Sequence, residues 1–436
     1  MKHHAVAELP SAGRTINALP KTSKFVLLII FVTLVFFTVT PVLYPLLSYP
    51  IYLLQSSFSS KSSSSTYEIP QQQQKDHIHA YHQSQNVCDI FSGEWVRNPD
   101  PPYYTNMTCS ALIHDHQFCM KYGRADTDFM KWKWKPYGCE LPVFDPSQFL
   151  EIVKGKSLAF VADSVGRNQI QSLICLLSRV EYPIDVSCTP DDKFKRWKYK
   201  TYNFTIAYFW APYLVKSKER DPSAQFTSLI NLYLDEFDEK WTSQIDGFIY
   251  LIISSGHWFI SRNRTVFYEN HQIVGCHHCQ LQNVTDLTKF YAYRKALRTA
   301  FKAINSLENF KGITFLRSFS PSHFENGLWS NGGTCNRTKP FRSNETVLGG
   351  DNLETYMIQM EELRAAEKEG RKRGKKYRVL DITQAMLLRP DAHPSKYGYW
   401  ASKKVMFNDC LHWCLPGPID TWNEILLQVL KIEGTR

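Results

Sequence analysis

The stretch Ser157-Leu-Ala-Phe-Val-Ala-Asp-Ser-Val-Gly-Arg-Asn-Gln169 indicates the fold class of this chain more clearly than any other part. Its first six residues are an apolar run with the length of one buried strand. The apolar positions that follow recur at the spacing of a helix, at Ile170, Leu173, Ile174 and Leu177. A strand that leads directly into a helix is the repeating unit of parallel α/β sheets.

The same alternation continues toward the C-terminus. We expect buried strands at 248–253, 313–316 and 379–382, and helices at 287–307, 353–368 and 421–430. This order predicts an α/β domain over residues 151–436, a three-layer sandwich with a parallel sheet between helices. Residues 88–150 are rich in Pro, Cys and aromatic residues without a long periodic run, which predicts an N-terminal segment of loops held by disulfides.

The first 87 residues predict a membrane anchor. Residues 25–47 carry no charge and can span about 30 Å of hydrocarbon at about 1.5 Å per residue. Residues 1–24 contain four basic residues against the single acid Glu8, which places this tail in the cytosol. A cleaved signal peptide is the alternative, but its apolar region is usually shorter. The Ser- and Gln-rich residues 48–87 are typical of a flexible stem.

All 11 cysteines and six glycosylation sequons lie beyond this stem. The sequons are at Asn106, Asn203, Asn263, Asn283, Asn336 and Asn344. Disulfides and N-glycans both form in the secretory pathway, so the two signals agree on a lumenal domain.

The composition excludes some functions. With 43% apolar and 14% aromatic residues the chain can fold around a full core. The net charge of +10 resolves into the cytosolic tail and a basic loop at 371–378. Two segments, 131–135 and 193–200, interleave bases with aromatic residues as single-stranded nucleic-acid sites do. A lumenal domain meets no such ligand, so we expect no nucleic-acid partner, and buried tryptophans rather than sugar-stacking ones.

Ser164 is the first candidate for chemistry. It follows the first strand and begins a helix, whose free N–H groups can hold an oxyanion. The alternative is that Asp163 or Ser164 only caps the helix. A serine nucleophile needs a histidine base oriented by a carboxylate. Two segments offer such pairs, Asp391-Ala-His393 and Asp409-Cys-Leu-His412, and loop histidines in polar turns are the alternative for both.

A set of ordered motifs resembles the plant trichome birefringence-like family of polysaccharide O-acetyltransferases. The motifs are Ala162-Asp-Ser164 with Arg167-Asn-Gln169, Ser255-Gly-His-Trp258, Arg389-Pro-Asp-Ala-His-Pro-Ser395, Asp409-Cys-Leu-His-Trp-Cys-Leu-Pro-Gly417, Cys88-Asp-Ile-Phe-Ser-Gly-Glu-Trp95 and Trp132-Lys-Trp-Lys-Pro136. The resemblance covers residue 88 to the end. Segments 172–178 and 252–259 are most similar to the xyloglucan O-acetyltransferase branch.

This resemblance implies an SGNH/GDSL-like fold and a serine acyltransferase. It makes Ser164 the nucleophile, His412 the base and Asp409 its orienting carboxylate. Arg167, Asn168, Gly256 and His257 become candidates for oxyanion or substrate contacts. It also implies no bound cofactor and no metal. The acetyl donor would be acetyl-CoA or another acetyl carrier.

The implied acceptor is a cell-wall polysaccharide. Xyloglucan side-chain galactose is favoured over xylan, mannan or pectin, and the implied place of action is the Golgi membrane with the catalytic domain in the lumen. An acetyl esterase that uses the same residues with water as acceptor is the second interpretation.

The cysteines allow two interpretations. The family pattern implies disulfides Cys88–Cys139, Cys109–Cys175, Cys119–Cys414 and Cys335–Cys410, and leaves Cys188, Cys276 and Cys279 over. The alternative is a split zinc site, because Cys276-His-His-Cys279 and Cys410-x-x-x-Cys414 have its outline. We expect disulfides.

One residue departs from the family pattern. Ala162 stands where the family usually has glycine. If the backbone there needed positive φ, alanine would strain the nucleophile, and the protein would be a silent glycan-binding module. If φ is negative, alanine is harmless, and we expect a working enzyme.

Overall fold

The computed structural model describes residues 88–436 except 114–115, 222–227, 262–263, 399–406 and 435–436. The expected tail, anchor and stem (1–24, 25–47 and 48–87) and the sequon at Asn263 lie outside the described residues. Among the helices that are described, none is both long and apolar enough to cross a membrane.

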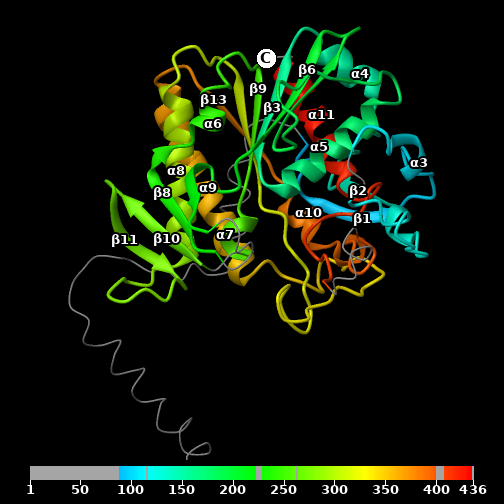
Figure 1. The fold of residues 1–436 in the computed structure, drawn as a ribbon. Helices are drawn as coiled ribbons and strands as arrows, with labels where there is room; N and C mark the ends of the chain where they lie inside the picture. Colours follow the sequence, from blue (N-terminus) through cyan, green and yellow to red (C-terminus); the bar gives the residue numbers. More distant parts are fainter. Residues whose placement is uncertain (1–87, 114–115, 222–227, 262–263, 399–406, 435–436) are drawn as a thin grey trace, which may run out of the picture. The chain divides into compact units, whose positions relative to one another are not determined.

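Figure 1 shows how the elements are arranged. In chain order they are β1 (Gly93–Arg97), α3 (Asn106–Cys109), η1 (Asp128–Met130), β2 (Trp132–Pro136), α4 (Pro146–Ile152), β3 (Ser157–Ala162), α5 (Ser164–Leu177), β4 (Ile184–Asp185), β5 (Phe194–Tyr199), β6 (Phe204–Trp210), β7 (Val215–Glu219), β8 (Ile230–Phe237), α6 (Glu239–Thr242), β9 (Tyr250–Ser254), α7 (His257–Ser261), β10 (Thr265–Glu269), β11 (Gln272–His277), α8 (Lys289–Ser306), β12 (Ile313–Arg317), α9 (Gly350–Arg371), β13 (Lys376–Leu380), α10 (Thr383–Leu387), η3 (Pro390–Ala392) and α11 (Asp420–Gly434).

A seven-stranded sheet lies at the centre, in the order β13-β12-β9-β3-β6-β5-β4. The first five strands of this order are parallel, with Phe160 of β3 opposite Ile252 of β9 and Tyr208 of β6. The edge strands β5 and β4 are antiparallel, so the sheet is mixed and the prediction of a wholly parallel sheet was wrong there. Strand β3 lies in the middle, with β9 on one side and β6 on the other, where an open α/β sheet forms its crevice.

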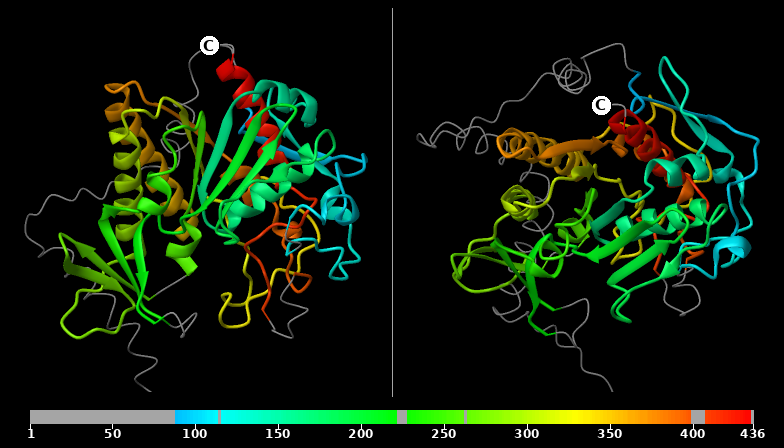
Figure 2. Two further views of the ribbon diagram at one scale, coloured as in Figure 1. Left: turned by 45° about the horizontal axis from the view of Figure 1, so that its top comes forward. Right: turned by 90° about the horizontal axis from the view of Figure 1, so that it is seen from above.

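Helices cover both faces of this sheet, as Figure 2 shows from above. Helices α4, α5 and α11 pack on one face and bury residues such as Leu173 and Ile425. Helices α8 and α9 pack on the other face, where Leu251 of β9 and Phe301 of α8 are buried. The chain thus has the expected three-layer SGNH-like α/β architecture.

A second sheet, in the order β11-β10-β8-β7, packs against α8 and was not predicted from the sequence. The cause is visible in β8, whose side chains alternate between buried and half-buried along Ile230–Phe237. Strands of a central parallel sheet are buried on both faces and give continuous apolar runs, which are easier to recognise than this alternation.

Residues 88–150 pack on the sandwich rather than forming a separate core. Strands β1 and β2 pair, the rings of Trp95 and Trp134 lie 5.6 Å apart, and the indole N–H of Trp95 donates to the carbonyl oxygen of Ala385 at 2.8 Å. Both tryptophans are buried, in line with the structural role expected for Trp134.

The structure contains the four disulfides that the resemblance implied, Cys88–Cys139, Cys109–Cys175, Cys119–Cys414 and Cys335–Cys410. It adds a fifth, Cys276–Cys279, between two cysteines left over by the family pattern. Cys188 is free and exposed. These bonds occupy every cysteine of the zinc alternative.

Most of the described sequons are accessible. Asn203, Asn283, Asn336 and Asn344 are exposed, whereas Asn106 is half-buried at the first position of α3. Four of the predicted glycosylation sites therefore lie on the surface of the fold.

Candidate active site

Ser164 lies at the carboxyl end of the central strand β3, as the first residue of α5. Asp163 caps this helix, because its Oδ1 accepts from the N–H groups of Val165 at 3.0 Å and Gly166 at 3.4 Å. The cap does not use the N–H of Ser164, which is the first donor of the helix. An oxyanion at Ser164 therefore meets an N–H group and the positive end of the α5 dipole.

A histidine and a carboxylate from the far end of the chain complete the constellation. The Nε2 of His412 lies 2.8 Å from the Oγ of Ser164, and its Nδ1 lies 2.9 Å and 3.1 Å from the two carboxylate oxygens of Asp409. A carboxylate on Nδ1 fixes the tautomer in which Nε2 accepts a proton. This arrangement can abstract the Ser164 proton.

Asp409 is suited to this role because it stays ionised. Burial by itself raises the pKa of its carboxyl, but the His412 ring and the N–H groups of His412 and Leu411 outweigh this and lower the pKa to about 2. Its backbone is held by a reciprocal pair of hydrogen bonds with Ser395. Asp409 is therefore an anion at any pH at which the protein works.

The segment around His412 is fixed from several sides. Cys410 is bonded to Cys335 and Cys414 to Cys119, so a disulfide leaves the chain on each side of the histidine. The side chain of Asn168 on α5 contacts the next residue, Trp413, accepting from its N–H at 2.8 Å and donating to its carbonyl at 3.2 Å. These bonds align the His412 segment with the helix that carries Ser164.

The second acid and histidine pair supports the first. His393 donates from Nδ1 to the carbonyl oxygen of His412 at 2.7 Å and stacks on Trp413 at 4.1 Å. Burial and the neighbouring His323 lower the pKa of His393 well below its usual range, so it is neutral. Asp391 is paired with Arg389 at 2.8 Å and 2.9 Å. Neither residue faces Ser164.

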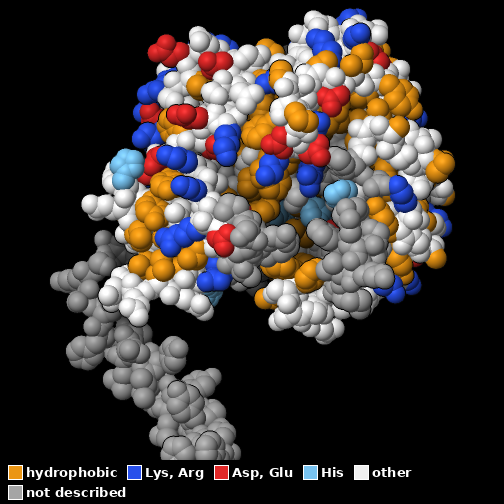
Figure 3. Space-filling model, viewed as in Figure 1, with side chains coloured by type: hydrophobic (Ala, Val, Ile, Leu, Met, Phe, Trp, Pro, Cys, Tyr) orange, Lys and Arg blue, Asp and Glu red, His pale blue; other side chains and the backbone are white. Residues whose placement is uncertain are grey.

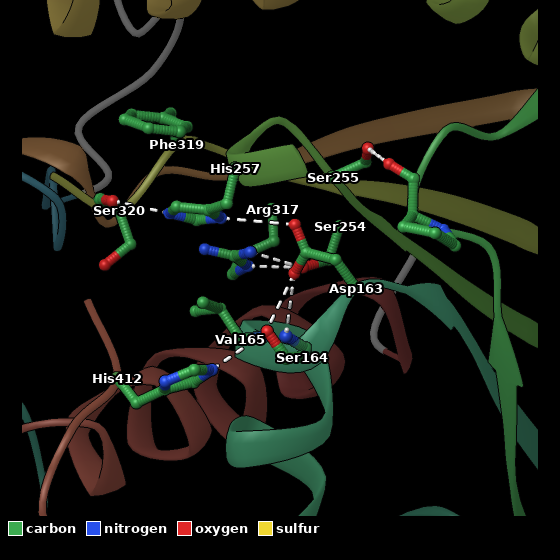
Figure 4. A network of polar contacts seen from close by, with 12 residues as sticks. Asp163, Ser164, Val165, Ser254, Ser255, His257, Arg317, Phe319, Ser320 and His412 are labelled. Atoms are coloured by element: carbon green, nitrogen blue, oxygen red, sulfur yellow. Dashed lines mark hydrogen bonds and ion pairs between the residues drawn. The ribbon is translucent and has the colours of Figure 1, made fainter. Parts of the chain in front are cut away.

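Two of the four oxyanion or substrate candidates have their side chains buried inside the fold. Asn168 is buried against Trp413, and His257 is buried between Asp163 and Ser320, with its ring nitrogens 3.2 Å and 2.8 Å from their oxygens (Figure 4). Both residues face polar partners inside the fold, which the sequence motif alone did not reveal. Gly256 is buried as well. Its φ of +141° favours glycine, and a side chain there would in addition press on Phe319.

Arg167 is the candidate that remains half-exposed near the nucleophile. It lies one helical turn after Ser164, with its guanidinium 5.9 Å from the ring of Trp210. Trp210 ends β6 next to Ala162 of β3, and its ring meets Trp258 of α7 at 5.4 Å. We call the side chains of Trp210, Trp258 and Arg167 the aromatic shelf. The sequence did not single out Trp210, because it lies in β6, which pairs with the antiparallel strand β5 and was not predicted.

Ala162 causes no backbone strain. It lies in β3, is buried, and is not among the non-glycine residues with positive φ. Its methyl group points toward Gly166, where an added Cβ would lie 2.3 Å away. The space for alanine at 162 thus comes from glycine at 166, and the reason to expect a silent site is gone.

No metal centre accompanies this site in the described part of the chain, which contains no group of three or more His, Cys, Asp or Glu side chains that could hold a metal ion. The space-filling view shows histidine side chains in a hollow near the middle of one face (Figure 3). The described side chains place the hydroxyl of Ser164 against a histidine whose other ring nitrogen faces a carboxylate.

Comparisons with known proteins agree with this geometry. Residues 141–429 match the GDSL/SGNH-like acyl-esterase family found in Pmr5 and Cas1p, and residues 86–140 match the PMR5 N-terminal domain. The chain is 58% identical to protein trichome birefringence-like 19 of Arabidopsis thaliana over 91% of each chain.

Relatives that are named for an activity match over nearly as large a share of the chain. The identity is 44% to xyloglucan O-acetyltransferase 4 of Populus trichocarpa, over 80% of this chain and 82% of that one, and 40% to xyloglucan O-acetyltransferase 1 of Arabidopsis thaliana, over 85% of each. A serine, histidine and aspartate at the carboxyl edge of an SGNH-like sheet is the arrangement that acyl transfer requires. The chain therefore belongs to the plant trichome birefringence-like family of polysaccharide O-acetyltransferases and is an O-acetyltransferase.

Proposed function

We propose that this protein transfers acetyl groups to xyloglucan in the Golgi lumen, with Ser164 as nucleophile, His412 as general base and Asp409 as its orienting carboxylate. The observation that carries the mechanism is the 2.8 Å contact between the Oγ of Ser164 and the Nε2 of His412, with Asp409 on the other ring nitrogen. General-base help of this kind contributes about 10²–10⁴-fold to rate.

The reaction takes two displacements. In the first, the Oγ of Ser164 bonds to the acetyl carbonyl carbon of the donor while its proton passes to the Nε2 of His412. The tetrahedral oxyanion lies at the start of α5, where the N–H of Ser164 donates to it. The bond to the leaving group then breaks, and the leaving group takes the proton from His412.

In the second displacement a sugar hydroxyl replaces the donor. His412 removes the proton of that hydroxyl as its oxygen attacks the acetyl-serine. The bond between the acetyl carbonyl carbon and the Oγ of Ser164 then breaks, and His412 returns the proton to this Oγ. Each half thus uses the same base and the same oxyanion position, and the acetyl group ends on the sugar.

The shelf of Trp210, Trp258 and Arg167 supports a saccharide acceptor. The apolar C–H face of a sugar ring packs well on an indole ring, and a guanidinium donates to its hydroxyls. The choice of xyloglucan, with its side-chain galactose, rests on the relatives that carry that name. The proposal does not depend on whether acetyl-CoA or another acetyl carrier is the donor.

The proposed location rests on the N-terminal sequence. An uncharged stretch at 25–47 behind a basic tail makes a type II anchor in the Golgi membrane, with the domain in the lumen. A fluorescent fusion that co-localises with a Golgi marker, with its C-terminus protected from protease in intact vesicles, tests this. Protection of the N-terminus instead would contradict it.

An acetylation assay tests the function. The purified full-length chain is incubated with acetyl-CoA or p-nitrophenyl acetate and with oligosaccharides of xyloglucan, xylan, mannan and pectin, and products are identified by mass. We expect acetyl-xyloglucan from wild type and none from a folded Ser164→Ala protein. Ser306→Ala, an exposed serine at the end of α8, is the matched control and keeps full activity.

The other interpretations give different results in the same assay. Release of acetate from acetylated xyloglucan without transfer identifies an esterase. Transfer to xylan, mannan or pectin alone corrects the acceptor. Binding of glycans with no turnover by wild type identifies a silent module and overturns the proposal.

A further inference from the structure

A second histidine and aspartate pair lies directly beside the nucleophile. Asp163 precedes Ser164 in the chain, and its Oδ2 lies 3.2 Å from the Nδ1 of His257. Asp163 is fully buried and His257 is 2% exposed, with the His257 ring stacked on Phe319 at 4.5 Å (Figure 4). The pair belongs to the wall behind the site, because neither side chain contacts Ser164 or His412.

The hydrogen bonds of His257 require two protons. Its Nε2 lies 2.8 Å from the carbonyl oxygen of Ser320, which can only accept, so Nε2 carries a proton. Its Nδ1 faces a carboxylate whose other oxygen already accepts from Val165 and Gly166. The contact therefore needs a proton of its own, held by either His257 or Asp163.

The charges around the pair decide whether His257 or Asp163 holds this proton. Burial alone raises the pKa of the Asp163 carboxyl, but His257 and the buried guanidinium of Arg317 outweigh burial and lower this pKa below its usual range. Arg317 ends β12 and keeps its charge at neutral pH, although burial lowers its pKa to about 10. Asp163 is therefore the anion, and the proton belongs to His257.

Other titratable groups near the pair do not compete for this proton. Tyr208 of β6 donates to the backbone carbonyl of Asp163 at 3.3 Å, and Tyr293 of α8 donates to that of Ser255 at 2.8 Å. Burial raises the pKa of both phenols above the ordinary tyrosine range, so they remain neutral. On the solvent side the remaining titratable neighbour is His412, which contacts Ser164 rather than the pair.

The position of this charge matters for the reaction. An aspartate at the N-cap stabilises α5, but its negative charge lies at the same helix end where the oxyanion must form. Two like charges close together in a buried site repel strongly. An imidazolium on the far oxygen of Asp163 removes most of that repulsion and leaves the hydrogen bonds of the cap in place.

We propose that His257 is a positioning residue that works as an imidazolium, and that its charge offsets the Asp163 carboxylate so that the start of α5 can hold the oxyanion formed at Ser164. This rests on the proposed role of Ser164 as nucleophile. A ring without the Nδ1 proton would turn a lone pair toward the carboxylate and would provide no offset, so the role depends on the second ring proton that the two acceptors require.

Acylation by p-nitrophenyl acetate tests this without an identified donor or acceptor. The rate of the burst of p-nitrophenolate and the KM are measured across pH for the full-length wild type, His257→Gln, Asp163→Asn and the double variant. An exposed histidine between β10 and β11 gives the matched control, His271→Asn, with wild-type behaviour. Loss of the burst in Ser164→Ala tests the proposed function separately.

The expected pattern follows from charge. His257→Gln leaves the guanidinium of Arg317 as the remaining cation beside the Asp163 carboxylate and lowers the acylation rate about 10- to 100-fold with KM nearly unchanged. Asp163→Asn loses less, because the amide still caps α5 and donates to a neutral His257. The double variant has no charge to offset and regains about tenfold over His257→Gln.

Two results overturn the proposal. One is a double variant that is no faster than His257→Gln, which is what loss of a packing residue gives. The other is a folded Asp163→Asn protein whose acylation rate falls more than about 100-fold, because loss of both charges should leave the oxyanion position without repulsion, and this second result is decisive even where His257→Gln does not fold. A wild type without a Ser164-dependent burst contradicts the proposed function instead.

Discussion

The methyl group of Ala162 and the absent side chain of Gly166 share one space, since a Cβ at 166 would lie 2.3 Å from the Cβ of Ala162. Both residues flank Ser164, one in β3 and one in the first turn of α5. The strand and the helix can approach this closely when one of the two positions is glycine. The pair thus fixes how the nucleophile turn packs on the sheet.

Exchange of these two residues gives the first prediction. Gly166→Ala is expected to cost about 2–4 kcal/mol of unfolding free energy and most activity, because two carbons cannot occupy the overlapping space. Ala162→Gly is expected to cost about 1 kcal/mol and to leave activity within a few-fold. The double variant, Ala162→Gly with Gly166→Ala, is expected to recover most of the loss. Denaturant titration and the acetylation assay measure both quantities.

Asn168 lies two residues after Gly166 in α5, and its hydrogen bonds with Trp413 involve neither of the exchanged residues. If the double variant is as unstable as Gly166→Ala alone, the cost arises from Ser254, whose Oγ would lie 3.1 Å from the new Cβ, and not from the space shared with Ala162.

Asp409→Asn tests the orientation of His412. The amide keeps the size of the carboxylate but presents an N–H group to Nδ1, so His412 adopts the wrong tautomer and kcat is expected to fall about 10³–10⁴-fold. Because the pKa of Asp409 is about 2, the aspartate stays ionised from about pH 4 upward, and the loss in Asp409→Asn is expected to persist over that whole range. Rate profiles of wild type and Asp409→Asn between pH 4 and 9 check this, and a difference that disappears toward pH 4 would show that Asp409 is already protonated there.

The interface between α11 and the N-terminal segment predicts how stability depends on pH. Burial raises the pKa of Glu424 to about 7 and that of Asp420, one turn earlier, to about 6, while Tyr103 and Tyr104 donate to them at 2.5 Å and 2.8 Å. The folded protein holds these protons more tightly than the unfolded chain. The unfolding free energy is therefore highest in acid and falls as pH rises from about 4.5 to 7, by on the order of 3 kcal/mol for Glu424.

Glu424→Gln removes most of this dependence, because the amide accepts from Tyr103 without a titration. Thermal unfolding at pH 5.5 and pH 8 measures the effect, with Glu354→Gln on the exposed face of α9 as control. Equal slopes in wild type and Glu424→Gln would show that Glu424 is not the group responsible.

The disulfides divide into one that supports the site and one that does not. Replacement of both Cys119 and Cys414 by alanine frees the segment that carries His412. We expect kcat to fall at least tenfold and the unfolding free energy to fall by about 2–5 kcal/mol. Removal of Cys276–Cys279, which closes a loop of three residues at the end of β11, is expected to cost less stability and no activity. The same activity loss in both variants would indicate general destabilisation rather than movement of His412.

The sequence predicted the parts that leave strong local patterns. Strand β3 and helix α5 appear as an apolar run followed by a helical period, and β9, β12, β13, α8, α9 and α11 appear in the same way. Strands such as β8 were missed because one of their faces is only half-buried and the pattern weakens.

For the site, the residue types and their family motifs indicated Ser164, Asp409 and His412, which the structure brings together. Asn168 and His257 were predicted as oxyanion or substrate contacts, and the structure buries their side chains against Trp413 and Asp163, which a motif does not reveal because it identifies a residue without showing which way it points. Arg317 was missed altogether. The one available signal was a charged residue at the end of the buried strand 313–316.

The two halves of the site are made at different times. Ser164 lies 248 residues before His412, and the Cys119–Cys414 bond closes 295 residues of chain only a few turns before the C-terminus. A chain still on the ribosome, or one truncated before residue 412, has a serine but neither its proposed base nor the bond that holds the base segment. Under the proposed mechanism, His412 must be synthesised before an acetyl group can be taken from the donor, so a chain without it cannot lose acetyl groups to water.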